Sequence, residues 1–221
     1  MKKFVSGVVA ALLLSACGQD SGSSQARTAD PDRPVGQPTF VLAFGDSLFA
    51  GYNLPQSAAY PAQLEQALRQ RGLNVRIQNA GVSGDTTSAG KQRMAFVLDS
   101  MTVQPDYALV EFGANDMLRG LSPDQARQNL DAILAEMDRR GIEVLLYEMK
   151  AAPNLGRDYA TRFESIYPDL AEKYDATVVP FFIEPLIFDR SLVQRDQVHP
   201  TEDGVKAMVE ETVDVVEDAI D

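Results

Sequence analysis

The chain contains a single histidine, His199, and an aspartate, Asp196, lies three residues before it. Far away in the sequence, the apolar run 40–44 leads into a Gly-Asp-Ser-Leu segment that contains Ser47. A serine hydroxyl becomes a nucleophile when a base removes its proton, and a neutral imidazole is the usual base near pH 7. A nearby carboxylate fixes the imidazole tautomer and stabilises the imidazolium. These residue types predict nucleophilic hydrolysis, with Ser47 attacking and His199 as the only available imidazole base.

The elements that must position these residues follow a regular alternation. Predicted strands cover 39–44, 74–79, 106–112, 142–148 and 176–181, and predicted helices cover 57–71, 85–100, 122–140, 158–174 and 201–219. Strands that alternate with helices of this length pair in parallel through right-handed crossovers. The sequence therefore predicts an α/β fold, a three-layer α/β/α sandwich with a central, mostly parallel five-stranded sheet.

Small or polar residues follow four of the predicted strands. Ser47 follows the first, Gly84 the second, Asn115 the third, and Pro153 with Asn154 the fourth. Each segment alone is typical of an ordinary turn or helix cap. In an open parallel sheet, however, the active site lies at the carboxyl ends of the strands. Their shared position predicts one common site.

The combination of motifs resembles the SGNH, or GDSL-type, hydrolases over about residues 40–215. It comprises the Gly-Asp-Ser-Leu segment, Gly84, Gly-Ala-Asn-Asp at 113–116 and Asp-Gln-Val-His at 196–199. The match is closest to the branch of multifunctional bacterial thioesterase I/lysophospholipase L1 enzymes and related arylesterases. The resemblance extends to 79–86, 109–120 and 166–168, and it implies a flavodoxin-like sandwich, in agreement with the alternation of strands and helices.

Carried over residue by residue, the resemblance implies that Ser47, Asp196 and His199 form a catalytic triad. It also implies an oxyanion hole made by the backbone N–H groups of Ser47 and Gly84 and by the side-chain amide of Asn115. We expect no cofactor and no metal. The expected reaction is hydrolysis of an acyl ester or a lysophospholipid through an acyl-enzyme.

One position departs from the familiar Gly-Gly-Asn-Asp form, because Ala114 replaces the second glycine. If this position requires a positive φ, alanine costs about 1 kcal/mol of strain or shifts the loop that carries Asn115.

Two loops are candidate walls of an acyl groove. They contribute Met117 and Leu118, and Pro153 and Asn154. The alternative for these residues is ordinary packing between loops and core.

Two other functions stay open at the level of sequence. A carbohydrate O-acetyl esterase is disfavoured because the chain has no tryptophan to act as a sugar platform. A non-catalytic envelope lipoprotein that retains the fold predicts a broken triad, yet every catalytic residue type is present.

The N-terminal region is typical of a bacterial lipoprotein. Residues 1–17 combine Lys2 and Lys3 with an apolar run that ends at Cys17, the only cysteine in the chain. The run is shorter than the roughly 20 residues that span a bilayer, so it reads as a signal peptide with a lipidation site. An ordinary secretory signal is the alternative. We expect residues 18–38, rich in Gly, Ser, Gln and Pro, to form a disordered linker, and 39–221 to form the hydrolase domain.

Charge narrows the possible partners. The formal net charge is −12, with 32 acidic against 20 basic residues, and the basic residues form no cluster. Nucleic acid is therefore not expected as a partner, and membrane attachment must come from acyl chains at Cys17. We expect a monomer in the periplasm, anchored to the outer membrane.

Overall fold

The computed structural model describes residues 37–221. Five strands form one sheet: β1 Thr39–Gly45, β2 Val75–Asn79, β3 Tyr107–Glu111, β4 Glu143–Tyr147 and β5 Thr177–Val179. Every neighbouring pair is parallel, and the order is β2-β1-β3-β4-β5. This is the flavodoxin-like order, so the predicted parallel five-stranded sheet is confirmed.

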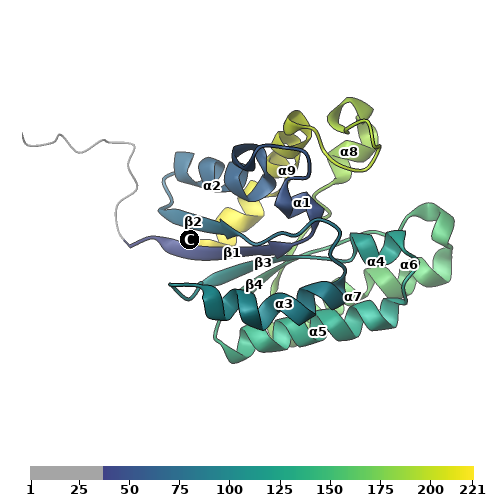
Figure 1. Ribbon diagram of the computed structural model, residues 1–221, viewed down its shortest axis with the longest axis horizontal. Coiled ribbons are helices and arrows are strands. Elements are labelled where there is room, and N and C mark those ends of the chain that lie inside the picture. Colours follow the sequence, from purple (N-terminus) through teal and green to yellow (C-terminus); the bar gives the residue numbers. More distant parts are fainter. Residues whose placement is uncertain (1–36) are drawn as a thin grey trace, which may run out of the picture. The chain divides into compact units, whose positions relative to one another are not determined.

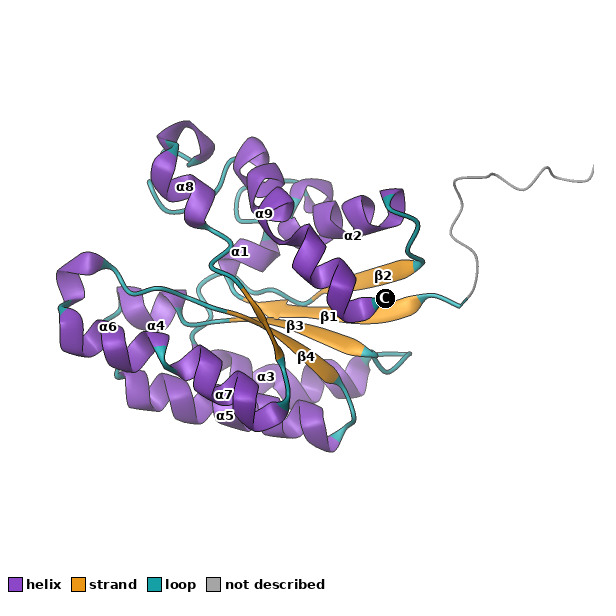
Figure 2. Ribbon diagram, turned by 180° about the vertical axis from the view of Figure 1, so that it is seen from behind, coloured by secondary structure: helices purple, strands orange, loops and turns teal. Residues whose placement is uncertain are grey.

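Helices cover both faces of the sheet (Figures 1 and 2). One layer holds α2 Tyr60–Gln70 and α9 Glu202–Ile220, and the other holds α3 Thr87–Ser100, α5 Pro123–Arg139 and α7 Ile166–Tyr174. Within 37–221, none of the helices is both long and apolar enough to cross a membrane. The predicted three-layer sandwich is confirmed for this domain. The predicted signal segment 1–17 and the linker up to residue 36 lie outside the described residues.

Three predicted boundaries are wrong. The helix predicted from residue 57 begins only at Tyr60, because Ala59 is extended. The segment 158–174 forms two helices, α6 Arg157–Glu164 and α7, divided at Ser165. Pro168 cannot donate to the carbonyl of residue 164 and would clash with it, so the first helix ends and a second begins. The last strand stops at Val179: Glu148 still donates its N–H to Val179 O, but the next N–H toward β4, that of Phe181, bonds to the Glu148 side chain instead of continuing the ladder.

Short elements at the ends of the strands were not predicted. They are the α-helices α1 Ser47–Ala50, α4 Ala114–Leu118 and α8 Glu184–Phe188, and the 3₁₀ turns η1 Gln56–Ala58, η2 Pro153–Leu155 and η3 Arg190–Leu192. A segment of three to five residues is too short to show helical periodicity in a sequence. All six lie in connections that follow the carboxyl end of a strand.

A buried hydroxyl network fastens the α2/α9 layer to the sheet. The hydroxyl of Tyr60 on α2 lies 2.9 Å from that of Tyr147 on β4 and 2.6 Å from that of Thr212 on α9. All three residues are fully buried, and Thr212 also donates to Met208 O within α9. Because buried hydroxyls must find partners inside the protein, this network fixes how α9 lies on the sheet.

We expect Thr212→Val to lower the free energy of unfolding by about 1 to 2 kcal/mol, because the isosteric side chain leaves a buried hydroxyl with one partner fewer. Chemical denaturation measures this change. Tyr60→Phe should give a similar loss, and the double variant should lose less than the two losses added. The exposed Thr177→Val is the matched control and should leave stability unchanged; strictly additive losses would contradict the network.

Candidate active site

Ser47 occupies a sharp turn between a strand and a helix. β1 ends at Gly45 and α1 begins at Ser47, so only Asp46 separates the two elements. The Asp46 side chain accepts the Leu48 N–H at 3.0 Å and thereby caps the helix. The turn places Ser47 at the carboxyl end of β1, where it is 8% exposed.

The structure brings Ser47, His199 and Asp196 together in hydrogen-bonding order. His199 Nε2 lies 2.9 Å from Ser47 Oγ, and His199 Nδ1 lies 2.7 Å from Asp196 Oδ2. When Asp196 is ionised it accepts the Nδ1–H, which leaves Nε2 unprotonated and able to accept the serine proton. This is the geometry required to activate a serine hydroxyl.

The Asp196 carboxylate is held by its own turn. Its Oδ1 accepts the backbone N–H groups of Val198 at 3.0 Å and of His199 at 3.1 Å. Together with the stronger hydrogen bond from the imidazole, these donors lower the pKa of Asp196 to about 2. The orienting carboxylate therefore stays charged throughout the range in which a protein is normally handled.

Two residues that the sequence did not reveal fix the imidazole in place. The Tyr52 ring lies against His199, with centroids 4.2 Å apart and planes 32° apart. Gln194 donates its backbone N–H to His199 O at 2.7 Å, and its side-chain amide donates to Tyr52 O at 2.9 Å and Pro200 O at 2.8 Å. Gln194 thus ties the histidine loop to the segment that follows α1.

The loops that carry Gly84 and Asn115 are joined to one another. Arg119 donates to Gly84 O at 2.7 Å. Asp116 accepts the backbone N–H of Thr87 at 2.8 Å and its hydroxyl at 2.7 Å. These bonds make the two segments one unit, and Asn115 directly precedes the anchored Asp116.

Both loops are also attached to the residues that precede the nucleophile. Val82 donates its N–H to Gly45 O at 3.0 Å, and Arg93 bridges Gly45 O and the carboxylate of Asp85. The Asn115 amide donates one hydrogen to Asp46 Oδ2 at 2.9 Å. Its second amide hydrogen has no acceptor among the described residues.

The condition for strain at Ala114, a positive φ, is not met. Ala114 is the first residue of α4 and has no positive φ; the left-handed position is Gly113, with φ 123°. A side chain at Gly113 would also meet the Tyr167 hydroxyl, whose oxygen lies only 2.2 Å from the place of a Cβ. Glycine is therefore needed one position earlier than expected, and alanine at 114 fits a helix start.

The two predicted groove segments lie next to each other. Met117 Sδ accepts the N–H of Ala152, immediately before η2, at 3.1 Å. Leu118 is 61% exposed, so its side chain is accessible beside the site. That Met117, Leu118, Pro153 and Asn154 line an acyl groove stays a prediction.

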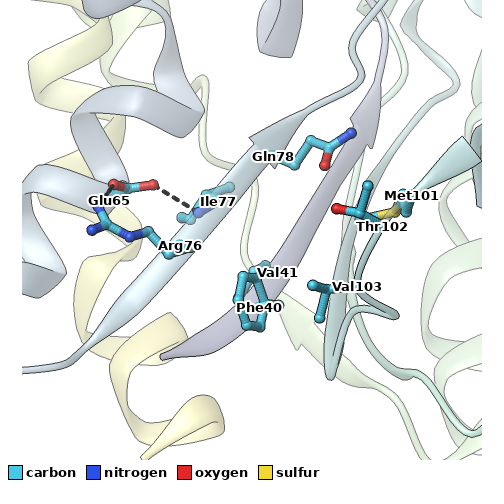
Figure 3. A pocket seen from close by; sticks show the side chains of 9 residues that line it. All are labelled: Phe40, Val41, Glu65, Arg76, Ile77, Gln78, Met101, Thr102 and Val103. Atoms are coloured by element: carbon cyan, nitrogen blue, oxygen red, sulfur yellow. Dashed lines mark hydrogen bonds and ion pairs between the residues drawn. The ribbon is translucent and has the colours of Figure 1, made fainter. Parts of the chain in front are cut away.

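A separate hollow of about 320 Å³ lies toward the amino end of β1 (Figure 3). Phe40 and Val41, Ile77 of β2 and Val103 after α3 are among its lining residues. None of its lining residues is Ser47, Asp196 or His199, so this hollow is separate from the triad. Within 37–221 no group of three or more His, Cys, Asp or Glu could hold a metal ion.

Comparison with known proteins identifies the family of this chain. The sequence profile of the GDSL-like Lipase/Acylhydrolase family matches residues 43–207. The chain belongs to this family. This GDSL-like hydrolase is 38% identical in sequence to an arylesterase of Vibrio mimicus. The match covers 160 residues, which are 72% of this chain and 79% of that protein. It is 39% identical to thioesterase 1/protease 1/lysophospholipase L1 of Escherichia coli K12 over 164 residues, 74% of this chain and 76% of that protein.

Solved structures agree with the sequence relatives. The SGNH-hydrolase family esterase AlinE4 superposes with a TM-score of 0.72 at 56% identity, covering 85% of this chain and 99% of that one. The psychrotrophic esterase EstA from Pseudoalteromonas gives a TM-score of 0.76 at 26% identity, covering 82% and 98%. This GDSL-like hydrolase is therefore a carboxylic ester hydrolase of the serine type.

We expect the pKa of Asp196 to be about 2 in the native protein and to rise when His199 is replaced by alanine. The rise should be partial, because the N–H groups of the turn remain as donors. Carbon-13 NMR of the carboxyl group, followed through acid titration, measures both values. An unchanged value in His199→Ala would show that the imidazole does not bond to this carboxylate.

Proposed function

We propose that Ser47 is the nucleophile of an acyl-enzyme mechanism. The observation that carries this proposal is the 2.9 Å separation of His199 Nε2 and Ser47 Oγ. Nε2 takes the serine proton as Oγ forms a bond to the ester carbonyl carbon. The imidazolium then gives that proton to the leaving alcohol as the C–O bond breaks. Water, activated by the same imidazole, hydrolyses the acyl-serine in a second cycle and restores the serine hydroxyl.

The negative charge that develops on the carbonyl oxygen needs fixed donors. We assign this role to the backbone N–H groups of Ser47 and Gly84 and to the free amide hydrogen of Asn115. Support comes from the anchoring of both loops to residues 45–46, which directly precede the nucleophile. Donors that are already in place cost no reorganisation during the reaction.

The proposed substrates are acyl esters, including aryl esters and lysophospholipids. The relatives named above are an arylesterase and a thioesterase/lysophospholipase, and the exposed Leu118 beside Met117 offers apolar contact to an acyl chain. A panel of chromogenic esters of increasing acyl length tests the proposal, because an apolar groove favours longer chains until it is filled.

Ser47→Ala should abolish hydrolysis of short p-nitrophenyl esters and leave thermal stability nearly unchanged, because it removes only the attacking oxygen. Activity and thermal denaturation are measured on the same preparation. A serine-directed fluorophosphonate should modify Ser47, as determined by peptide mass spectrometry. The neighbouring loop variant Ser83→Ala is the matched control and should remain active. Retained activity in Ser47→Ala, or labelling at another serine, would exclude Ser47 as nucleophile.

Asn115→Ala should lower kcat about 100-fold or more with a smaller change in KM, because an oxyanion contact strengthens in the transition state. Steady-state kinetics with a single short ester measure both constants. A change confined to KM would instead make Asn115 a substrate-positioning residue.

We propose further that the protein is a lipid-anchored monomer of the periplasm, held at the outer membrane through Cys17. Support for the anchor is the placement of the only cysteine at the end of an apolar signal-like run. Gly18 rather than aspartate follows it, which by resemblance to sorting in Gram-negative bacteria favours the outer membrane. Support for a monomer is that one chain supplies all the proposed catalytic groups.

In a Gram-negative host, the full-length protein should partition into the detergent phase, because two or more acyl chains anchor a protein stably. Cys17→Ala should lose the lipid mass and this partitioning. Gly18→Asp is the matched control: it should keep the lipid but move the protein toward the inner membrane. If the wild type and Cys17→Ala are both recovered as soluble protein of equal mass, the segment is only a secretion signal.

A further inference from the structure

A buried pair of carboxyl groups adjoins the nucleophile and has no part in the mechanism above. Asp46 directly precedes Ser47, and Glu111 is the last residue of β3; both are fully buried. Glu111 lies opposite Gly45 in the parallel register of β1 and β3. Acidic side chains are almost never fully buried unless their charge is compensated, so this pair requires a specific arrangement.

The hydrogen-bond donors around the pair are unequally divided. Asp46 accepts the Leu48 N–H at 3.0 Å and the Asn115 amide at 2.9 Å. Glu111 accepts the N–H of Asp46 at 3.0 Å, and its Oε1 has no hydrogen-bond partner among the described residues. Because donors stabilise the ionised form of a carboxyl, the negative charge is better placed on Asp46 than on Glu111.

The proton of the pair therefore rests on Glu111. Glu111 Oε2 lies 3.0 Å from the backbone nitrogen of Asp46, so the two buried carboxyls are neighbours and repel each other unless one of them is protonated. Burial, reinforced by the charge of Asp46, raises the pKa of Glu111 well above its usual range. Burial also raises the pKa of Asp46, but its hydrogen bonds from Leu48, Glu111 and Asn115 oppose that effect.

The main chain makes room for this contact at Gly45. A Cβ at Gly45 would lie 2.7 Å from Glu111 Oε2 and 2.9 Å from Glu111 O. Any side chain there would push the glutamate away from the Asp46 N–H that it accepts. β1 thus has no side chain at Gly45, where the Glu111 carboxyl of the neighbouring strand β3 reaches the turn that carries Ser47.

We propose that Glu111 and Asp46 are positioning residues for the oxyanion donor: the protonated carboxyl of Glu111 donates to the Asp46 carboxylate, which holds one hydrogen of the Asn115 amide. The amide plane is then fixed, and its second N–H faces the developing oxyanion. This inference rests on the proposed role of Asn115. It explains why a buried acid is placed in the otherwise apolar strand β3.

The first test compares two replacements of Glu111 by steady-state kinetics on a short p-nitrophenyl ester. Glu111→Gln keeps a donor for Asp46 and an acceptor for its N–H, and should stay within about threefold of wild-type kcat. Glu111→Leu removes the donor and should lower kcat about tenfold or more with KM nearly unchanged. If a folded Glu111→Gln loses as much as Glu111→Leu, the neutral-donor role is wrong. Thermal denaturation and near-UV circular dichroism establish that each variant is folded.

The second test does not depend on Glu111→Leu folding. In Asp46→Asn the side-chain oxygen can still cap α1, but its NH₂ group cannot accept the Asn115 amide. This variant should lower kcat about 10- to 100-fold in the wild-type background, and less than about threefold when Asn115 is already alanine.

This double-mutant cycle distinguishes the positioning role of Asp46 from the oxyanion role of Asn115. If the losses of Asp46→Asn and Asn115→Ala multiply in the double variant, Asp46 does not act through Asn115, and the positioning inference fails while the role of Asn115 stands. If Asn115→Ala alone is as active as the wild type, the proposed oxyanion role fails, and the inference that rests on it fails with it.

Discussion

The site depends on one hydrogen bond, between His199 Nε2 and Ser47 Oγ, which joins residues 152 positions apart in the sequence. Neither residue can reach the other through local structure. Parallel pairing of β1 with its neighbours brings the carboxyl ends of the strands to one edge of the sheet, where the loops that bear reactive groups meet. The fold therefore supplies proximity, and the loops supply orientation.

Orientation is achieved by hydrogen bonds that fix each reactive residue or the turn that carries it. The cap of α1 sets Ser47, the Asp196 turn sets the imidazole tautomer, and Gln194 ties the histidine loop to Tyr52. Asn115 is in turn held by Asp46. Such fixed polar groups bring charge into the interior, a cost that active sites commonly carry so that no reorganisation is needed during catalysis.

The architecture could be predicted from the sequence because its signals are strong. Apolar runs such as 40–44 and helical stripes such as that of 122–140 give the layers, and the strand-end position of Ser47 and Asn115 predicts a shared edge. The predicted bounds of the helix 158–174 were wrong because Pro168 acts on the carbonyl of a residue four positions earlier. The spacing of apolar residues does not show this effect.

The supporting residues of the site were harder to predict for a different reason. Tyr52 contacts His199 through tertiary structure alone, and spacing along the chain cannot show which ring faces which. Glu111 did leave a signal, an acid inside the apolar run 108–112, but its partner could be identified only from the register that sets it opposite Gly45. At Ala114 the motif comparison raised the condition of a positive φ, and the structure shows that the condition applies to Gly113 instead.

The most direct test of the account uses the fact that the chain has only one histidine. Nitrogen-15 NMR of the uniformly labelled protein in mildly alkaline solution reports both imidazole nitrogens without ambiguity of assignment. We expect a protonated Nδ1 bonded to Asp196 and an unprotonated Nε2 facing Ser47, with the chemical shift of Nε2 changing in Ser47→Ala. A protonated Nε2, or an equal mixture of tautomers that Ser47→Ala leaves unchanged, would contradict the claim that His199 is poised to take the proton of Ser47.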